Sequence, residues 1–253
     1  MRIRREGFAI LSTSRQNRGS RCRPRQSWAT SLFILIACLA QAEVTVQASS
    51  LTSPSTRVDF QEWNELDVSA KLAERIDLTW VSRERIGDDL KNPSTFYSTG
   101  VDVNFAASKH LTLTPSFYYV DRLTAAGQRQ FTRAPILAVT LADTWDRWTL
   151  SDRSRLVGAL SNGGADFWVF QNRPRIDYRF RSDPGAASVF LWDEISYYSN
   201  YATWKRNRIA AGTRMAIGRR CVVDFYYLRQ DDSRSRIREI NAVGTTLELR
   251  IRP

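Results

Sequence analysis

Apolar and polar residues alternate with a period of two along most of the chain from Val58 onward. Between Val243 and Ile251 the odd positions are mostly large and apolar, while the even positions are Gly, Thr, Glu and Arg. Between Trp168 and Phe180 one face is mainly aromatic or apolar, and the other carries Gln, Asp and three arginines. Successive side chains of a β-strand point to opposite faces, so this period predicts strands and an all-β fold.

Eleven segments show this alternation and are separated by turn-forming stretches. They cover 58–70, 75–86, 95–106, 110–121, 131–142, 147–156, 167–180, 188–198, 204–217, 221–230 and 236–252. A length of about 10 residues suits a tilted strand that crosses a bilayer. The connections tend to alternate between short and long. We therefore expect an antiparallel transmembrane β-barrel of about 10–12 strands. Bacterial barrels have even strand numbers, and the segment 44–56 could supply a twelfth strand.

A soluble β-sandwich also alternates, so the period alone leaves that alternative open. Tryptophans near segment ends favour the membrane barrel, because aromatic side chains form girdles at both membrane interfaces. These tryptophans are Trp63, Trp80, Trp145, Trp148, Trp168, Trp192 and Trp204. The ending Leu249-Arg-Ile-Arg-Pro253 departs from the terminal aromatic that is common in outer-membrane barrels.

The first 42 residues differ from the rest. Met1–Gln26 holds eight arginines against one acid, Glu6, and a charge-free apolar stretch follows at Trp28–Ala42. A basic leader, a short apolar run and the small-x-small ending Ala40–Ala42 together predict a secretory signal peptide. A buried core helix is the alternative. We expect a signal peptide at 1–42, a polar linker at 43–57 and an outer-membrane barrel at 58–253.

Two details of the leader stay open. Cleavage is expected after Ala42, with Ala48 as a second small-residue site. Leu35–Cys38 also resembles a lipobox, in which Cys38 would be acylated and become the N-terminus. The basic segment is long for a leader, so the true start codon is a further open point.

The leader changes the meaning of the net charge. The whole chain carries +11, and the eight arginines and one glutamate of the leader account for most of that excess. A basic balance can indicate nucleic-acid binding, but here it belongs mainly to the export signal. We expect outer-membrane lipid as the partner and no nucleic acid; the sequence identifies no protein partner.

Residues for catalysis or metal binding are scarce. His110 is the one histidine, in a short connection, and it reads as a turn residue. Cys221 is the one cysteine after the leader, so it has no partner for a disulfide or a thiolate metal site. We expect no catalytic residues, no metal and no cofactor. An enzyme that modifies outer-membrane lipid remains an alternative, because acyl hydrolases use a histidine-activated nucleophile.

Most of the candidate functional residues lie on the polar face of the predicted strands. If apolar residues face lipid, a set of charged residues faces the lumen: Glu65, Arg83, Arg85, Arg173, Arg175, Arg179, Glu194, Arg206, Arg208 and Arg214, with Asp59 and Asp67 beside them. Buried charges must be paired, so one interpretation is a structural or interaction barrel filled by salt bridges. The alternative is an anion-permissive channel.

Several segments resemble one bacterial family. They are Asp59-Phe-Gln-Glu-Trp-Asn-Glu-Leu-Asp-Val68, Leu78-Thr-Trp-Val-Ser82, Asn92-Pro-Ser-Thr-Phe-Tyr97, Gly100-Val-Asp-Val-Asn-Phe105, Lys109-His-Leu-Thr-Leu-Thr-Pro115 and Asn172-Arg-Pro-Arg175. The chain resembles domain of unknown function 2490 over about Val58 to Ile251. The resemblance implies a barrel of the outer membrane, and it carries over no catalytic residues.

Overall fold

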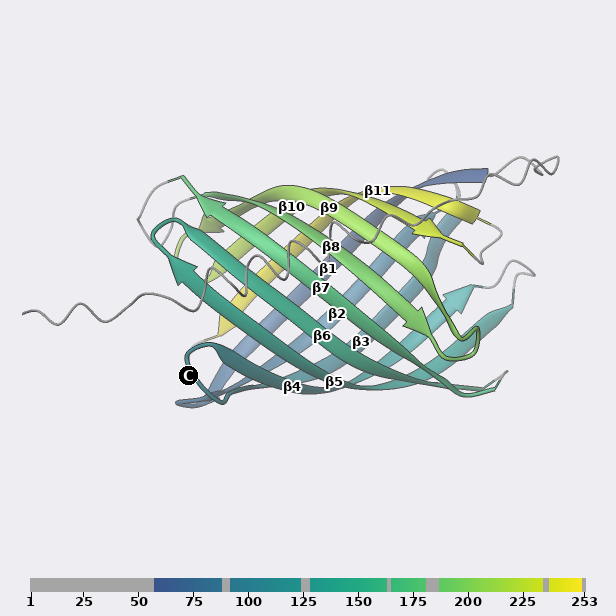
Figure 1. Ribbon diagram of the computed structural model, residues 1–253, viewed down its shortest axis with the longest axis horizontal. Helices are drawn as coiled ribbons and strands as arrows, with labels where there is room; N and C mark the ends of the chain where they lie inside the picture. The colour runs from purple at the N-terminus through teal and green to yellow at the C-terminus, as the bar shows by residue number, and fades with distance from the viewer. Residues whose placement is uncertain are drawn as a thin grey trace, which may run out of the picture. The chain divides into compact units, whose positions relative to one another are not determined.

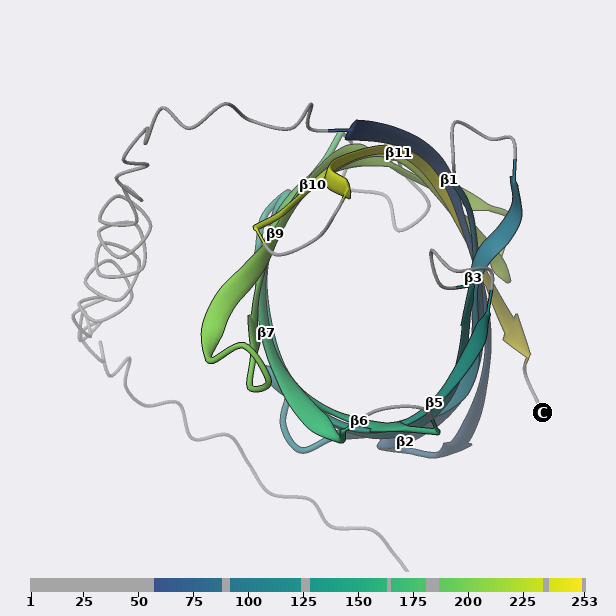
Figure 2. The same ribbon diagram turned by 90° about the vertical axis from the view of Figure 1, so that its right-hand side faces the viewer.

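The computed structural model describes residues 57–87, 92–123, 128–162, 165–180, 187–233 and 237–251. Within these ranges the chain forms eleven strands that close into one barrel (Figures 1 and 2). The strands are β1 (Arg57–Ala73), β2 (Ile76–Gly87), β3 (Asn92–Ala106), β4 (Leu111–Leu123), β5 (Arg129–Trp145), β6 (Trp148–Ser161), β7 (Phe167–Arg179), β8 (Ser188–Tyr198), β9 (Thr203–Ile217), β10 (Cys221–Asp232) and β11 (Ile237–Ile251). Each of the eleven predicted segments is a strand. No helix in these ranges is long and apolar enough to cross a membrane.

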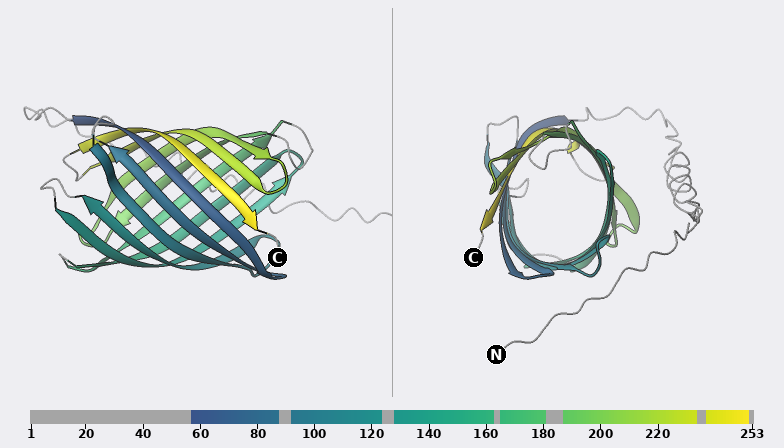
Figure 3. Two further views of the ribbon diagram at one scale, coloured as in Figure 1. Left: turned by 180° about the vertical axis from the view of Figure 1, so that it is seen from behind. Right: turned by 90° about the vertical axis from the view of Figure 1, so that its left-hand side faces the viewer.

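Each strand pairs with its neighbours in the chain in antiparallel fashion, and β1 pairs with β11 to close the ring. This last pair is parallel, with Glu65 opposite Thr246, and the two strands lie side by side in Figure 3. The expected even strand number is therefore wrong for the described barrel. An odd number of alternating strands leaves the first and last running the same way, so the closing ladder must be parallel. The possible twelfth strand at 44–56, the leader and most of the linker lie outside the described residues.

The two ends of the barrel differ. The short connections β1–β2, β3–β4, β5–β6 and β9–β10 lie at one end, which we call the short-turn end. Asp146 and Gly218 have positive φ of 50° and 71° in two of these turns. β11 runs toward this end and β1 begins at the opposite one. The predicted alternation is incomplete, because the β8–β9 connection at the opposite end is also tight, with Ala202 at φ 50°.

Alternation along the strands separates the two faces of the wall. Large apolar side chains point outward, including Phe117, Leu137 and Ile217, which are 53%, 54% and 60% exposed. Two of the tryptophans expected in a girdle do not belong to it: Trp63 and Trp192 are 7% and 8% exposed and pack in the barrel interior. The girdle prediction misplaced them because each occupies one of the alternate positions of its strand that face inward, which we call positions of inward parity.

Glycines let aromatic rings lie against the inner wall. A Cβ on Gly244 would fall 2.1 Å from Cζ of Tyr226, and a Cβ on Gly212 would fall 2.8 Å from Cζ of Phe190. Tyr226 packs beside the buried cluster that contains Trp63 and Trp192. The small residues thus make room for aromatic packing inside the barrel.

Candidate functional site

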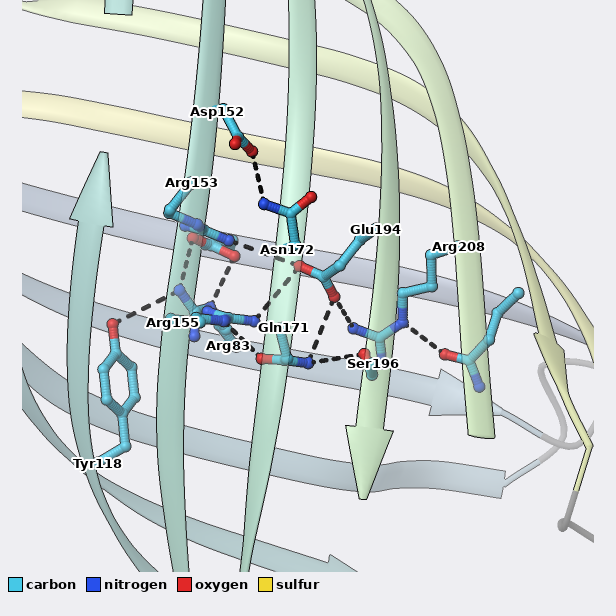
Figure 4. A network of polar contacts seen from close by, with 12 residues as sticks. Arg83, Tyr118, Asp152, Arg153, Arg155, Gln171, Asn172, Glu194, Ser196 and Arg208 are labelled. Atoms are coloured by element: carbon cyan, nitrogen blue, oxygen red, sulfur yellow. Dashed lines mark hydrogen bonds and ion pairs between the residues drawn. The ribbon is translucent and has the colours of Figure 1, made fainter. Parts of the chain in front are cut away.

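A network of charged and polar side chains fills the middle of the barrel interior (Figure 4). We call it the central network, and its members lie near the middle of their strands. They are Glu65 of β1, Arg83 of β2, Tyr118 of β4, Arg153 and Arg155 of β6, Gln171 and Arg173 of β7, Glu194 and Ser196 of β8, and Arg208 of β9. The period of two places all of them on the inward face.

Glu194 is the best buried acid of this network, at 2% exposure. Its Oε1 accepts a hydrogen bond from Nη1 of Arg208 at 3.1 Å. Its Oε2 lies 3.7 Å from Nη2 of Arg153 and 3.6 Å from Nη2 of Arg155. Gln171 donates its amide to Ser196 at 3.2 Å and to Glu194 at 3.5 Å. Side chains of three other strands, β6, β7 and β9, therefore converge on the carboxylate of β8.

A second part of the network joins β1 to β4. Arg83 makes a two-point contact with Glu65, Nε to Oε2 at 2.8 Å and Nη2 to Oε1 at 3.2 Å. The same Nη2 reaches the hydroxyl of Tyr118 at 3.5 Å, and that hydroxyl donates to Asp102 at 2.8 Å. Side chains from four neighbouring strands are thus fixed to one another. A forked arginine–carboxylate contact is the strongest geometry for such a pair.

Aromatic rings connect the network across the interior. The guanidinium of Arg208, on β9, lies 5.2 Å from the ring centre of Trp63, on β1. Arg85 lies over the same ring at 3.8 Å and over Phe96 at 4.3 Å. Arg173 lies over Trp192 at 5.2 Å. When a guanidinium lies on an aromatic face, the ring attracts its positive charge and takes the place of water there.

Further ion pairs lie between the central network and each end of the barrel. Toward the short-turn end, Arg214 bridges Asp224, at 3.0 Å, and Glu248. Toward the opposite end, Arg206 makes a 2.7 Å contact with Asp232, which is 3% exposed. Ion pairs therefore occur toward both ends of the interior as well as in its middle.

The ten residues predicted to face the lumen fall into four groups. Glu65, Arg83, Arg173, Glu194 and Arg208 lie in the central network, and Arg85 lies beside it against Trp63. Arg175, which pairs with Asp177 at 2.7 Å, and Arg214 lie toward the short-turn end. Arg206 lies toward the opposite end. Arg179, at the end of β7, is opposite Ser188 of β8.

Sequence reasoning missed Arg153 and Arg155, although both bind Glu194. They lie in Ser151-Asp-Arg-Ser-Arg155, where both faces of the strand are polar. Alternation therefore gave no sign of which side faces inward. Parity counted from Leu156 and Leu160, further along the same strand, would have placed both arginines inside.

Two cavities lie on the short-turn side of the central network. The larger, of about 660 Å³, is lined by Asp67, Asp77, Asp102, Asn104 and Glu248 among others. The smaller, of about 160 Å³, shares Asp102 and Asn104 with it. Arg83, Arg153 and Arg155 line the smaller cavity. The larger cavity, whose lining also includes Lys71 and Arg250, thus shares part of its wall with the cavity beside the arginines of the central network.

His110, the one histidine, makes contacts that hold its turn in place. Nδ1 of His110 lies 3.2 Å from the carbonyl oxygen of Ala142 and 3.4 Å from Oδ1 of Asp143. The hydroxyl of Ser108 accepts the backbone N–H groups of His110 and Leu111. These contacts hold the β3–β4 turn against β5. Among the described residues, no group of histidine, cysteine and acidic side chains could hold a metal ion.

Comparison with known proteins finds solved structures of similar fold and a matching family model. An anion-selective porin from Comamonas acidovorans is similar at 10% sequence identity and a TM-score of 0.38; the match covers 70% of this chain and 54% of the porin. The chain spans about half the length of that porin. No curated protein matches the chain. The model of the family described as "Protein of unknown function (DUF2490)" matches residues 60–241, which is most of the barrel. The chain therefore belongs to the DUF2490 family.

Proposed function

We propose that this protein is a barrel of the bacterial outer membrane whose interior is closed by the central network, and that it serves as a structural or interaction barrel. The observation that carries the proposal is the burial of Glu194 beneath three arginines from two other strands. Side chains that satisfy one another in this way leave few groups to line a water-filled path.

The outer face supports insertion into lipid. Large apolar side chains are exposed on strands all around the barrel, among them Trp80, Phe117, Leu137, Leu191 and Phe225. Soluble monomers rarely expose contiguous apolar patches above a few hundred Å². The arginines of the central network lie on the opposite, inward face. A lipid-facing apolar surface around a polar interior is the arrangement of outer-membrane barrels.

Strand length is consistent with the same proposal. The strands contain 11 to 17 residues. A tilted strand needs about 9–11 residues to cross the hydrocarbon core. Each strand is therefore long enough to cross, and the longer ones continue beyond the bilayer.

One observation favours a second function, an anion-permissive channel. Five arginines of the central network, Arg83, Arg153, Arg155, Arg173 and Arg208, face two glutamates, Glu65 and Glu194. If the interior opens, the remaining positive charge would favour anions. A closed interior predicts that no solute passes through the barrel, whereas an open interior predicts that anions pass.

Reconstitution tests both parts of the proposal. The full chain, refolded in the presence of lipid vesicles, should float with them and resist extraction by carbonate. Vesicles loaded with gluconate or with a neutral sugar should then retain both solutes. Release of gluconate but not of a cation of similar size would support the channel instead. Protein that stays in the aqueous phase would contradict membrane insertion.

A further inference from the structure

A polar patch interrupts the apolar outer face on β6, β7, β8 and β9. Asp152 and Ser154 of β6, Asn172 of β7, Asp193 of β8 and Asn207 of β9 have outward parity. We call this set the wall patch. Asp152 is in phase with the exposed Trp148 and Leu156, and Asn207 with the exposed Ile209. Asp193 lies between the exposed Leu191 and Ile195 on the same face of its strand.

Hydrogen bonds link the members of the wall patch. Asn172 donates its amide to Asp152 at 2.8 Å (Figure 4) and to Ser154 at 3.0 Å. Asn207 donates to Asp193 at 2.8 Å. A carboxylate can accept about four hydrogen bonds. The side-chain bonds within the patch therefore leave acceptor capacity unused on both aspartates.

The position of the wall patch makes lipid an unsuitable neighbour. Leu150, Ile176, Leu191, Ile209 and Ala211 surround it on the outward face of the same four strands. Ionisable side chains at membrane depth are costly, and they pair with one another or face protein or water. Two aspartates on the lipid side of one wall thus indicate that this wall is covered by protein.

We propose that the wall patch is the interface through which two copies of this chain form a dimer side by side in the membrane. The proposal rests on the membrane insertion argued above. The patch contains both donors and acceptors, so a second identical patch can satisfy it. Most homo-oligomers are closed and symmetric, and a two-fold interface uses the same surface on both copies.

The strand register shows how a two-fold axis would match the patch with itself. Asn172 of β7 is opposite Ile195 of β8, two residues beyond Asp193. Asn172 and Asp193 are therefore diagonal neighbours on the outer face, about 7–8 Å apart between backbones. A two-fold axis between β7 and β8, parallel to the barrel axis, would bring Asn172 of one copy against Asp193 of the other, and the reverse. Each Asn172 amide would exchange its bond to Ser154 of its own copy for one to Asp193 of the other copy, so that an amide meets a carboxylate twice and the two aspartates do not meet.

The test measures the oligomeric state of inserted protein. Full-length chain is reconstituted into vesicles, insertion is established by flotation, and mass is measured after transfer to nanodiscs. We expect a dimer for the wild type. The double variant Asn172→Leu and Asp193→Leu should insert and be mainly monomeric, with a dimer dissociation constant raised about tenfold or more, since every lost contact is lost twice. Thr245→Leu, an outward polar residue on β11, is the matched control and should stay dimeric.

Site-specific photo-crosslinking keeps the proposal testable if the double variant fails to fold. A photoreactive side chain at position 172 should give a crosslinked product of twice the chain's mass, and one at position 245 should not. Inserted wild type that is monomeric and crosslinks at neither position would overturn the dimer while leaving membrane insertion intact. A crosslink from position 172 to a different protein in cells would overturn the second copy as occupant. Protein that never floats with vesicles would contradict the membrane proposal itself.

Discussion

The guanidinium of Arg208 lies 5.2 Å from the ring centre of Trp63, although β10 and β11 separate their strands around the barrel. Arg208 also donates to the buried carboxylate of Glu194. One arginine thus contacts both the acid at the centre of the network and the tryptophan ring on β1. The contact shows that side chains from distant parts of the ring meet inside it.

Glu194→Gln should destabilise the protein by about 3 kcal/mol, because loss of one partner leaves buried charges uncompensated. Arg153, Arg155 and Arg208 would then face one another without their acid. Guanidinium chloride unfolding of vesicle-inserted protein measures the change. Asp231→Asn, which weakens an exposed pair with Arg229, is the control and should leave the midpoint unchanged. Equal stability of the two variants would mean that Glu194 is not needed to offset the charge of the three arginines.

The side of the wall that each residue faces can be tested at two adjacent positions. Leu247 is opposite Leu66 and Val223, whereas Thr246 is opposite Glu65 and Asp224. Arginine on a lipid-facing site costs about 2–4 kcal/mol near the membrane midplane. Leu247→Arg should therefore destabilise the inserted barrel more than Thr246→Arg, whose new charge would lie near two carboxylates. The reverse order would mean that the inward and outward faces are exchanged.

Gly212→Ala should destabilise the barrel by about 1–3 kcal/mol, the usual range for forcing an extra group into a packed interior. Its Cβ would meet the backbone oxygen of Phe225, which cannot turn aside as a side chain can. Gly158→Ala is the matched substitution, because its nearest neighbour is the ring of Pro135 at 3.1 Å. Equal thermal unfolding temperatures for the two variants would contradict close packing at Gly212.

Cys221→Ser should leave folding and insertion unchanged. Cys221 is a free thiol, part-exposed, at the start of β10. It has outward parity with Val223 and Phe225, so its thiol contributes little to the interior network. Unfolding curves of the variant and the wild type should superimpose. A clear loss of insertion in the variant would show a role that the surrounding residues do not explain.

Period-two alternation was enough to predict the eleven strands and the inward face of residues such as Arg83 and Glu194. It could not predict the parallel pairing of β1 with β11, because the alternation within a strand does not show which strands pair to close the barrel. It also failed where both faces are polar, as in Ser151–Arg155. There the inward arginines belong to the central network and the outward Asp152 and Ser154 belong to the wall patch. Trp63 and Trp192 point inward because they share the alternation of Glu65 and Glu194, which the girdle interpretation did not take into account.

The central claim is that the central network closes the interior, and single-channel recording in planar bilayers tests it most directly. Protein whose insertion has been established separately should give no steady conductance steps. Combined replacement of Arg153, Arg155 and Glu194 by alanine, which removes long side chains from the middle, should produce steps if the variant inserts. Regular, anion-selective steps from the unaltered protein would contradict closure and establish the channel instead.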